Sequence, residues 1–400
     1  MNFPDVFNLN YIYTIAMIKD NKVLEYDVMI IGAGPAGCAC ALELRNAGLR
    51  VALVDKAAFP RDKVCGDAIP GRAIKTLKQI DPEFEIAFKN FHKKYETKRT
   101  TLYYKKKAIT FDWVRTAYTC TRIEFDNFLF SLVRKNTITD IYTNTLPDTF
   151  IKTDNGFSVT IKNSPAIFNT KILIGADGAQ SAVAKQLTNK KLDRDHHVGS
   201  IRAYFSNVSG IEDTTEIYFD HEFLPSYLWV FPLPGNMVNV GFGMLSEEIS
   251  TRKINLKKAF YDFINNTPEL KLKFKNALQL SDLEGFGLPL GSKINTLSGA
   301  NFMLTGDAAS LIDPISGDGI GNAMLSGKLA AEQAISCLKK VDFTSVFMKQ
   351  YDQSLLQIIG KELKTHYRAQ RILSKMPLLL DILFLACKHQ TLNKIVRKKL

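Results

Sequence analysis

Runs of apolar residues that end at or just before glycine recur along the chain. They lie at 26–31, 51–54, 171–174 and 302–305. Short continuous apolar runs are typical of parallel strands that are covered on both faces. A stretch with helical spacing, about 36–46, separates the first two runs and ends near a glycine, as helices often do. The pattern therefore predicts a βαβ unit at the start of a parallel sheet.

The segments between these runs alternate between β-type and helical patterns. Residues 101–120 and 197–245 are rich in aromatic and β-branched residues and predict antiparallel strands. Asp154-Asn-Gly156 predicts a hairpin turn. Residues 122–134 and 253–276 have the apolar spacing of amphipathic helices.

The order of these elements predicts an α/β fold with an α+β insert. The core pieces are scattered, because a β-rich segment separates the last apolar run from the first three. We expect four regions: an N-terminal extension (1–25), a discontinuous Rossmann-like domain (26–190 and 296–340, with a small substrate-side insert near 65–120), a β-sheet substrate domain (191–295) and a helical C-terminal region (341–400).

Composition narrows the class of protein. Hydrophobic residues make up 46% of the 400 residues and charged residues 23%, which is ordinary for a globular protein and excludes wholesale disorder. The net charge is +12, but residues 361–400 hold ten Lys or Arg and two Asp or Glu, so they carry +8 of it. A broad nucleic-acid-binding surface is therefore a poor interpretation, and we expect no nucleic-acid partner.

The cysteines and the chain ends point to a cytoplasmic protein. The six cysteines and the histidines lack the spacing of zinc ligands, and we expect no metal. No apolar stretch is long enough to span a membrane, and the first 25 residues do not resemble a secretory signal. Residues 376–387 are apolar and precede a basic tip. Two interpretations stay open: peripheral contact of 376–400 with the inner face of a membrane, or a packed helix with a solvated tip.

The first motif with chemical meaning is Gly32-x-Gly34-x-x-Gly37, followed by Asp55 at the end of the second apolar run. The first glycine permits a tight strand-to-helix turn, the second lets the backbone approach a pyrophosphate, and the third lets helix and strand pack closely. The helix N-terminus offers unpaired N–H groups to phosphate, and the carboxylate can accept from ribose hydroxyls. A dinucleotide site follows.

Two further apolar runs end in a glycine next to a carboxylate. Gly175-Ala-Asp177-Gly178 follows one run, and Gly306-Asp307 follows another. Together with Gly32–Gly37, these motifs resemble the three FAD fingerprints of the p-hydroxybenzoate-hydroxylase-type flavoproteins. The resemblance covers about residues 26–340. It implies FAD as cofactor, with Asp307 at its ribityl chain and the loop from Pro314 near its flavin ring. The cofactor-binding residues that it implies are Gly32, Gly34, Pro35, Ala36, Gly37, Asp55, Lys56, Arg122, Asp177, Gly178, Gly306, Asp307, Pro314, Gly317, Gly319 and Ile320.

A fourth motif narrows the resemblance. Tyr227-x-Trp229-x-Phe231-Pro232 precedes Gly241-x-Gly243, and Lys63-x-Cys65-Gly66-Asp67 follows the second strand. Both resemble signatures of the geranylgeranyl reductase family, whose members use FAD to saturate double bonds of isoprenoid chains. The three aromatic residues share one face of a strand, so we expect a wall of an apolar pocket, with Pro232 ending the strand. The implied substrate-binding residues are Cys65, Gly66, Tyr227, Trp229, Phe231, Pro232, Gly241 and Gly243.

The resemblance implies hydride transfer from reduced flavin to one alkene carbon and a proton to the other. Cys65 is the candidate proton donor, with an inert packing role as the alternative. No second dinucleotide motif is present at 180–300, so electrons would come from NAD(P)H or a reduced carrier. The competing activity is an FAD monooxygenase, hydroxylase or halogenase; Tyr227 and Phe231 depart from the halogenase pattern. We expect an isoprenoid lipid or quinone-like substrate and a monomer or weak homo-oligomer.

Overall fold

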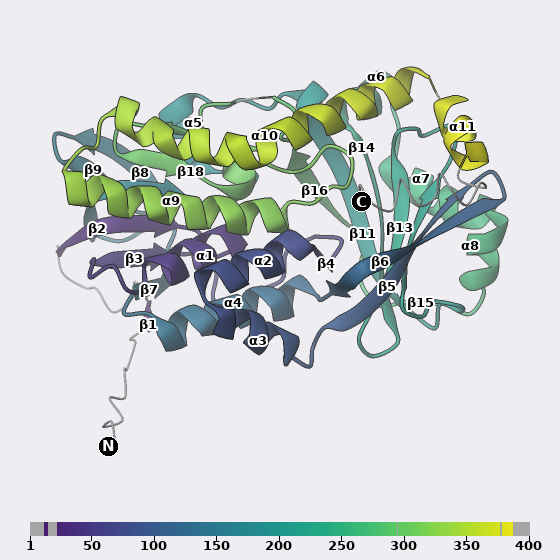
Figure 1. The fold of residues 1–400 in the computed structure, drawn as a ribbon, viewed down its shortest axis with the longest axis horizontal. Helices are drawn as coiled ribbons and strands as arrows, with labels where there is room; N and C mark the ends of the chain where they lie inside the picture. Colours follow the sequence, from purple (N-terminus) through teal and green to yellow (C-terminus); the bar gives the residue numbers. More distant parts are fainter. Residues whose placement is uncertain (1–11, 15–21, 294, 377, 387–400) are drawn as a thin grey trace.

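Two β-sheets form the centres of two lobes in the computed structural model, which describes residues 12–14, 22–293, 295–376 and 378–386 (Figure 1). The first sheet has the strand order β1-β7-β3-β2-β10-β18-β17, and the β8–β9 hairpin continues it from β10. Its strands are β1 (Ile12–Thr14), β2 (Val23–Ile31), β3 (Val51–Val54), β7 (Asp140–Thr143), β8 (Pro147–Thr153), β9 (Gly156–Ile161), β10 (Ile167–Gly175), β17 (Ser298–Gly299) and β18 (Phe302–Leu304).

The central strands of this sheet are parallel and end at one edge. Ile31 of β2 pairs with Val54 of β3 and with Gly175 of β10, which in turn pairs with Leu304 of β18. The register therefore brings the three glycine–carboxylate motifs together, because each begins where its strand ends. Ligands of open α/β sheets bind at this carboxyl edge.

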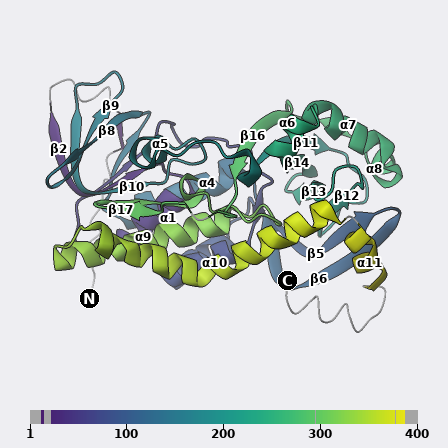
Figure 2. The same cartoon turned by 90° about the horizontal axis from the view of Figure 1, so that it is seen from above.

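Helices cover one face of the first sheet, and the β8–β9 hairpin with α5 lies on the other (Figure 2). The apolar faces of α1 and α9 pack together and on the parallel strands. The helices of this lobe are α1 (Pro35–Leu44), α2 (Gly71–Ile80), α3 (Pro82–Lys89), α4 (Arg122–Asn136), α5 (Ala182–Thr188) and α9 (Ile320–Lys340), with the short 3-10 helix η3 (Gly306–Ala309).

The second sheet is largely antiparallel and has the order β15-β11-β14-β13-β12-β5-β6-β4, with β16 beside β11. Two distant segments build it, because β12 pairs with β5 in parallel. Its strands are β4 (Ala68–Ile69), β5 (Tyr95–Tyr104), β6 (Lys107–Thr119), β11 (His197–Ser206), β12 (Thr214–Phe219), β13 (Tyr227–Leu233), β14 (Met237–Leu245), β15 (Leu278–Gln279) and β16 (Glu284–Pro289), preceded by the 3-10 helix η2 (Arg194–His196).

One face of this sheet packs on three short helices, α6 (Ser246–Thr251), α7 (Leu256–Asn266) and α8 (Pro268–Lys273). Phe260 of α7 and Leu270 of α8 are fully buried and belong to one apolar cluster with Leu228 and Val230 of β13. The opposite face of β13, which carries the predicted aromatic wall, is therefore left for the first lobe.

The C-terminal helices join the lobes. Helix α10 (Ser345–Lys375) runs along α9 and continues across to the second lobe (Figures 1 and 2). There Arg371 pairs with Glu247 of α6 at 3.4 Å. Helix α11 (Leu378–Ala386) then turns onto the β5–β6 hairpin, where Phe384 packs on Tyr104.

Several elements differ from the sequence expectation. The N-terminal extension supplies β1 at the sheet edge, and β2 starts at Val23, earlier than its apolar run. Strand β13 passes through Pro232 to Leu233, so the proline does not end it. At Pro232 the strand pairs with β14 alone, because its pairing with β12 ends at Val230, and a backbone with one paired neighbour tolerates a proline.

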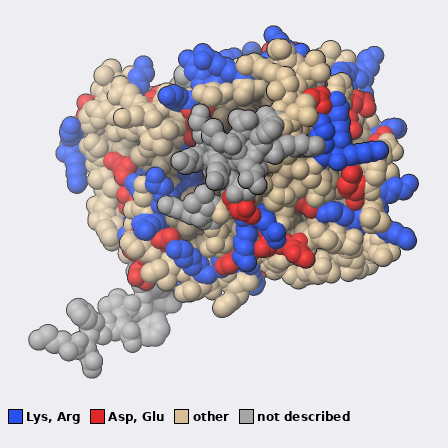
Figure 3. All heavy atoms as spheres, turned by 45° about the vertical axis from the view of Figure 1, so that its right-hand side comes forward, with Lys and Arg blue, Asp and Glu red and all other residues tan. Residues whose placement is uncertain are grey.

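Charged side chains of both signs are mixed on one face of the molecule. On the face shown in Figure 3, Lys and Arg side chains are interspersed with Asp and Glu and with uncharged residues. Among the described residues, no helix is both long and apolar enough to cross a membrane. The basic tip that the sequence places after residue 387 lies outside the described residues.

Candidate active site

The turn between β2 and α1 has the geometry that a dinucleotide phosphate needs. Gly32 has φ +102°, a region that side chains avoid, and a methyl group built on it would lie 2.4 Å from the Ala176 carbonyl oxygen. A methyl group on Gly37 would lie 1.8 Å from the Gly32 carbonyl oxygen. The glycines are therefore required by close packing, and α1 starts at Pro35 with its N-terminus open toward the strand ends.

The carboxylates of two predicted sites also organise their own loops. Asp55 is buried and accepts from the backbone N–H groups of Ala33 (2.7 Å) and Ala57 (2.8 Å). Asp177 accepts from Ser181 and from the first N–H groups of α5. Both lie at the carboxyl edge of the sheet where they were expected. Lys56, beside Asp55, is exposed.

Asp307 lies in a more charged setting. Its carboxylate pairs with Lys63 at 2.9 Å, and Lys190 donates to the carbonyl oxygens of Asp307 and Ala308. Burial acts to raise the pKa of Asp307, but Lys63 and then Arg122 more than offset it, so the pKa is lowered. Asp307 is therefore ionised and can accept hydrogen bonds from ribityl hydroxyls.

A cation that the sequence motifs did not include, Arg61, lies over the glycine turn. Arg61 stacks on Phe59 and pairs with Asp126 at 2.8 Å, and its Nη2 lies 3.5 Å from where a side chain on Gly34 would begin. The Nη1 atom, which contacts Asp126, is buried and makes no well-aligned hydrogen bond, and Nη2 is the atom that lies over Gly34. A guanidinium over the glycine turn fits the pyrophosphate of FAD. The residues of this edge thus fit the cofactor that the fingerprints imply.

The glycine-rich loop at 314–321 connects the cofactor edge with the second sheet. Gly317 has φ +69°, and Gly319 lies 3.4 Å, measured from a built side chain, from Asp307 Oδ1. The Tyr227 hydroxyl donates to the Ser316 carbonyl oxygen at 3.0 Å. Pro314 and Ile320 bound this loop, and Ile320 begins α9. The predicted cofactor-binding and substrate-binding residues therefore lie next to each other at this loop.

Tyr227, Trp229 and Phe231 share one face of β13 and are each partly exposed, while their neighbours Leu228 and Val230 are buried. Their rings form a continuous series, with centroids 6.4 Å apart at each step. This is the aromatic wall that the sequence predicts. Pro232 has the opposite parity and is buried, so the structure places it away from this wall.

Two glycines admit the central ring of the wall. A methyl group on Gly241 would lie 2.0 Å from Trp229 Cζ2, and one on Gly66 would lie 3.4 Å from its Nε1. Gly243 pairs with Tyr227 across the β13–β14 ladder and faces Val198 and Ser200 instead. The indole thus lies directly against the loop that carries Cys65.

Cys65 is partly exposed next to Gly66. Burial raises the pKa of its thiol, and the nearby Arg122 guanidinium offsets this only in part. The thiol is therefore protonated at neutral pH and can donate a proton. Arg122 itself is buried and holds Asp126 through two hydrogen bonds, at 2.8 and 2.7 Å.

Sequence reasoning missed Asp67, the residue after the Cys65-Gly66 pair. It is fully buried, has φ +64°, and accepts from Tyr204 and Asn239 on Oδ2 and from the Arg122 N–H on Oδ1. Burial raises its pKa to about 6. The sequence offered one signal: a carboxylate directly after the Cys65-Gly66 pair, of a residue type that adopts positive φ more readily than most.

The sequence profile of the family described as "FAD binding domain" matches residues 25–238, and that of the "Geranylgeranyl reductase catalytic domain" matches residues 198–280. The chain belongs to the family of FAD-binding oxidoreductases that carry the FAD-binding domain, and its second sheet is similar to the geranylgeranyl reductase catalytic domain. The second match includes β13 and β14, so it includes the aromatic wall and Gly241 but not Gly66. The predicted fold class and FAD-binding character are therefore confirmed.

Curated reductases are similar to this chain over most of their length. A digeranylgeranylglycerophospholipid reductase of Methanococcus vannielii is 29% identical, over 88% of this chain and 87% of its own. A menaquinone reductase of Mycobacterium tuberculosis is 29% identical over 76% of each chain.

Solved structures agree on the fold. A geranylgeranyl bacteriochlorophyll reductase-like protein of Thermoplasma acidophilum superposes with a TM-score of 0.77 at 26% identity, covering 88% of both chains. A flavin-dependent brominase has a TM-score of 0.75 at 21% identity, covering 94% of this chain and 92% of its own. At that identity the brominase shows a shared fold alone.

Proposed function

We propose that this protein saturates carbon–carbon double bonds of an isoprenoid chain, with reduced FAD as the hydride source. The observation that carries the proposal is the aromatic wall, Tyr227, Trp229 and Phe231. It contacts the glycine-rich loop at 314–321 through Ser316 and the loop that carries Cys65 at Gly66. An apolar, partly exposed wall fits an alkene chain better than a polar substrate. The names of the relatives, reductases of a digeranylgeranyl lipid and of menaquinone, support the same class.

FAD, when bound and reduced, supplies a hydride to one alkene carbon. The protein's own residues position the chain, exclude water and hold the proton. The wall shields the chain on one side, and its protonated neighbour Cys65 is the candidate donor to the second carbon. Asp307 and Arg61 would hold the sugar and phosphate portions of the cofactor, with the flavin ring toward the loop at 314–321.

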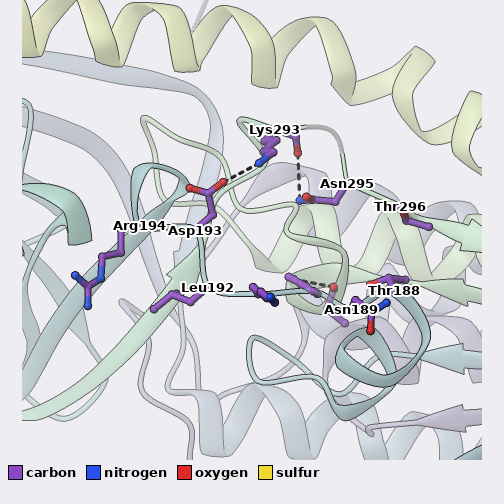
Figure 4. A pocket seen from close by; sticks show the side chains of 11 residues that line it. Thr188, Asn189, Leu192, Asp193, Arg194, Lys293, Asn295 and Thr296 are labelled. Atoms are coloured by element: carbon purple, nitrogen blue, oxygen red, sulfur yellow. Dashed lines mark hydrogen bonds and ion pairs between the residues drawn. The ribbon is translucent and has the colours of Figure 1, made fainter.

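We also propose NAD(P)H, or a reduced electron carrier, as the electron donor. A cavity of about 460 Å³ lies behind the Asp307 turn, lined by 188–194, Lys293, Asn295, Thr296 and Ala308 (Figure 4). Its lining is net positive, because it holds Lys190, Lys191, Arg194 and Lys293 against one acid, Asp193, which pairs with Lys293 at 2.8 Å. Such a lining suits the phosphates of a nicotinamide nucleotide.

The donor is tested by anaerobic stopped-flow reduction of the bound flavin. We expect NADPH or NADH to reduce the wild-type flavin, and Lys191→Glu with Arg194→Glu to slow this step while reduction by dithionite is unchanged. No reduction by either nucleotide would leave a protein carrier as the donor. Equal rates in the wild type and the double variant would remove the pocket from the electron path.

The location that we propose is cytoplasmic, with peripheral contact to the inner face of the membrane through 376–400. Helix α11 supports this, because Leu378, Ile382 and Leu385 are 73%, 58% and 54% exposed. An apolar substrate would reach the protein from a bilayer, so contact there is consistent with the proposed chemistry.

The reaction itself is tested by mass spectrometry. Purified enzyme reduced with dithionite is incubated without oxygen with digeranylgeranylglycerophospholipid or menaquinone in detergent. We expect product masses to rise by two hydrogens for each double bond. A hydroxylated product formed only after air is admitted would contradict the reductase and favour a monooxygenase.

A further inference from the structure

Asn239, in the middle of β14, is a fully buried amide whose hydrogen-bonding groups all have partners. Its Oδ1 accepts from Trp229 Nε1 at 2.8 Å. Its Nδ2 donates one hydrogen to the Cys65 carbonyl oxygen at 2.7 Å and the other to Asp67 Oδ2 at 2.8 Å. One side chain thus connects the aromatic wall to the backbone of the loop that carries the thiol.

The orientation of this amide is fixed by its surroundings. Cys65 and Asp67 offer only acceptors on one side, so the NH2 group must face them, and the oxygen must face the indole N–H. Asp67 itself accepts hydrogen bonds from the Tyr204 hydroxyl at 2.8 Å and from the backbone N–H of Arg122 at 3.2 Å. A flipped amide would leave buried donors facing one another, which costs free energy.

Steric contacts alone do not determine the position of the indole. Gly66 and Gly241 present only backbone to the indole, without side chains that would fix its orientation, and Trp229 is partly exposed. The directional hydrogen bond from Nε1 therefore selects among the ring orientations that these contacts permit.

We infer that Asn239 is a positioning residue that fixes the Trp229 indole against the Cys65–Gly66 loop. The aromatic wall and the Cys65 thiol thereby keep a fixed position relative to each other at the proposed substrate site. The expected effect of Asn239 on substrate turnover rests on the proposed isoprenoid reduction. Its effect on the orientation of the indole does not, because it concerns only contacts within the chain.

The test uses Trp113→Phe enzyme with FAD bound. The sequence holds two tryptophans, so Trp229 is then the sole indole. Asn239→Leu removes the acceptor. We expect the ultraviolet resonance Raman band that reports indole N–H hydrogen bonding to shift, and kcat/KM for dithionite-driven reduction of digeranylgeranylglycerophospholipid in micelles to fall about tenfold or more, with FAD content unchanged.

A double-mutant cycle identifies Trp229 as the residue through which Asn239 acts. Trp229→Phe alone should lower kcat/KM to a similar extent, and the double variant should be no worse than either single variant. Asn265→Leu, at an exposed position of α7, is the matched control and should change neither readout. If Asn239→Leu fails to fold, Asn239→Ser serves the same comparison.

An unchanged indole band in the Asn239 variant, or fully multiplicative losses in the cycle, would overturn the inference. A wild-type enzyme that reduces no isoprenoid would instead defeat the proposed function, while the Raman comparison would still decide the role of Asn239.

Discussion

Single atoms decide the shape of the candidate site, and Gly241 is the sharpest case. Adding a methyl group there would bring it within 2.0 Å of Trp229 Cζ2. Atoms cannot approach so closely, so the indole must leave its position. The glycine is thus required by one neighbouring ring and has no φ requirement of its own.

Gly241→Ala should therefore lower isoprenoid reduction by about tenfold or more, because a displaced wall misplaces the substrate chain. FAD content, measured by absorbance after denaturation, should be unchanged, since the cofactor motifs lie on the other sheet. Gly71→Ala is the control, because nothing lies within 4 Å of a side chain built there. Equal loss in both variants would contradict the steric argument.

Asp67 gives a prediction about pH. Its pKa in the folded protein, about 6, is above its ordinary value of 3.8 because the carboxyl is buried. Its contribution to stability is therefore fully present below 3.8 and is lost as the pH rises through about 6. The stability of the wild type relative to Asp67→Asn should fall over this window by about 1.4 kcal/mol per pH unit.

Urea unfolding at several pH values between 4 and 7.5 measures this difference. The exposed Asp148→Asn variant is the control and should stay parallel to the wild type. Parallel curves for Asp67→Asn as well would show that Asp67 does not titrate in this window.

Residue-level partners differ in how far the sequence can predict them. Each glycine–carboxylate motif follows an apolar run, so its place at a strand end could be read locally. Asp67, by contrast, binds Tyr204 and Asn239, which are 137 and 172 residues away. No local spacing encodes such a contact, because it depends on how one sheet packs on the other. The roles assigned to the individual site residues stay predictions.

At the scale of elements, α10 and α11 do more than cover the core. His366 of α10 hydrogen-bonds to Asp313 at 2.6 Å, and Gln370 donates to the Pro314 carbonyl oxygen at 2.7 Å. These two bonds hold the start of the glycine-rich loop at 314–321. The predicted helical C-terminus gave no sign of this, since polar residues on a helix usually face water. Glu362 lies close to both His366 and Asp313, but it is paired with Arg72.

Helix α11 presents its exposed apolar face next to a basic turn. Lys105, in the tip of the β5–β6 hairpin, pairs with Asp381 of α11 at 2.9 Å, and Lys106 beside it is exposed. Apolar side chains flanked by cations favour an anionic lipid surface.

Leu378→Ser with Ile382→Ser should reduce flotation of the protein with phosphatidylglycerol-containing liposomes, and high salt should reduce it further. Val346→Ser removes an exposed apolar side chain at the far end of α10, and it is the control. Flotation that is unaffected by the α11 changes would exclude this helix as the contact.

For the whole molecule, each of the two sheets contributes a different part of the candidate site. The first gathers the nucleotide motifs at one edge because its parallel strands end in register. The second supplies a rigid wall whose other face is anchored by α7 and α8. The order of elements along the chain predicted both layers, but it could not give the pairing of β5 with β12 that completes the second sheet.

That pairing also sets an order of events during synthesis. Arg99 of β5 finds its partner, Thr214 of β12, only after 115 more residues have been made. Until then one edge of the β5–β6 hairpin has unpaired N–H and C=O groups, which is the kind of surface that promotes aggregation. Contacts this distant also slow folding. The nascent chain is therefore most vulnerable between the emergence of β6 and that of β12, and a chaperone that holds the hairpin in this interval would raise the yield of folded protein.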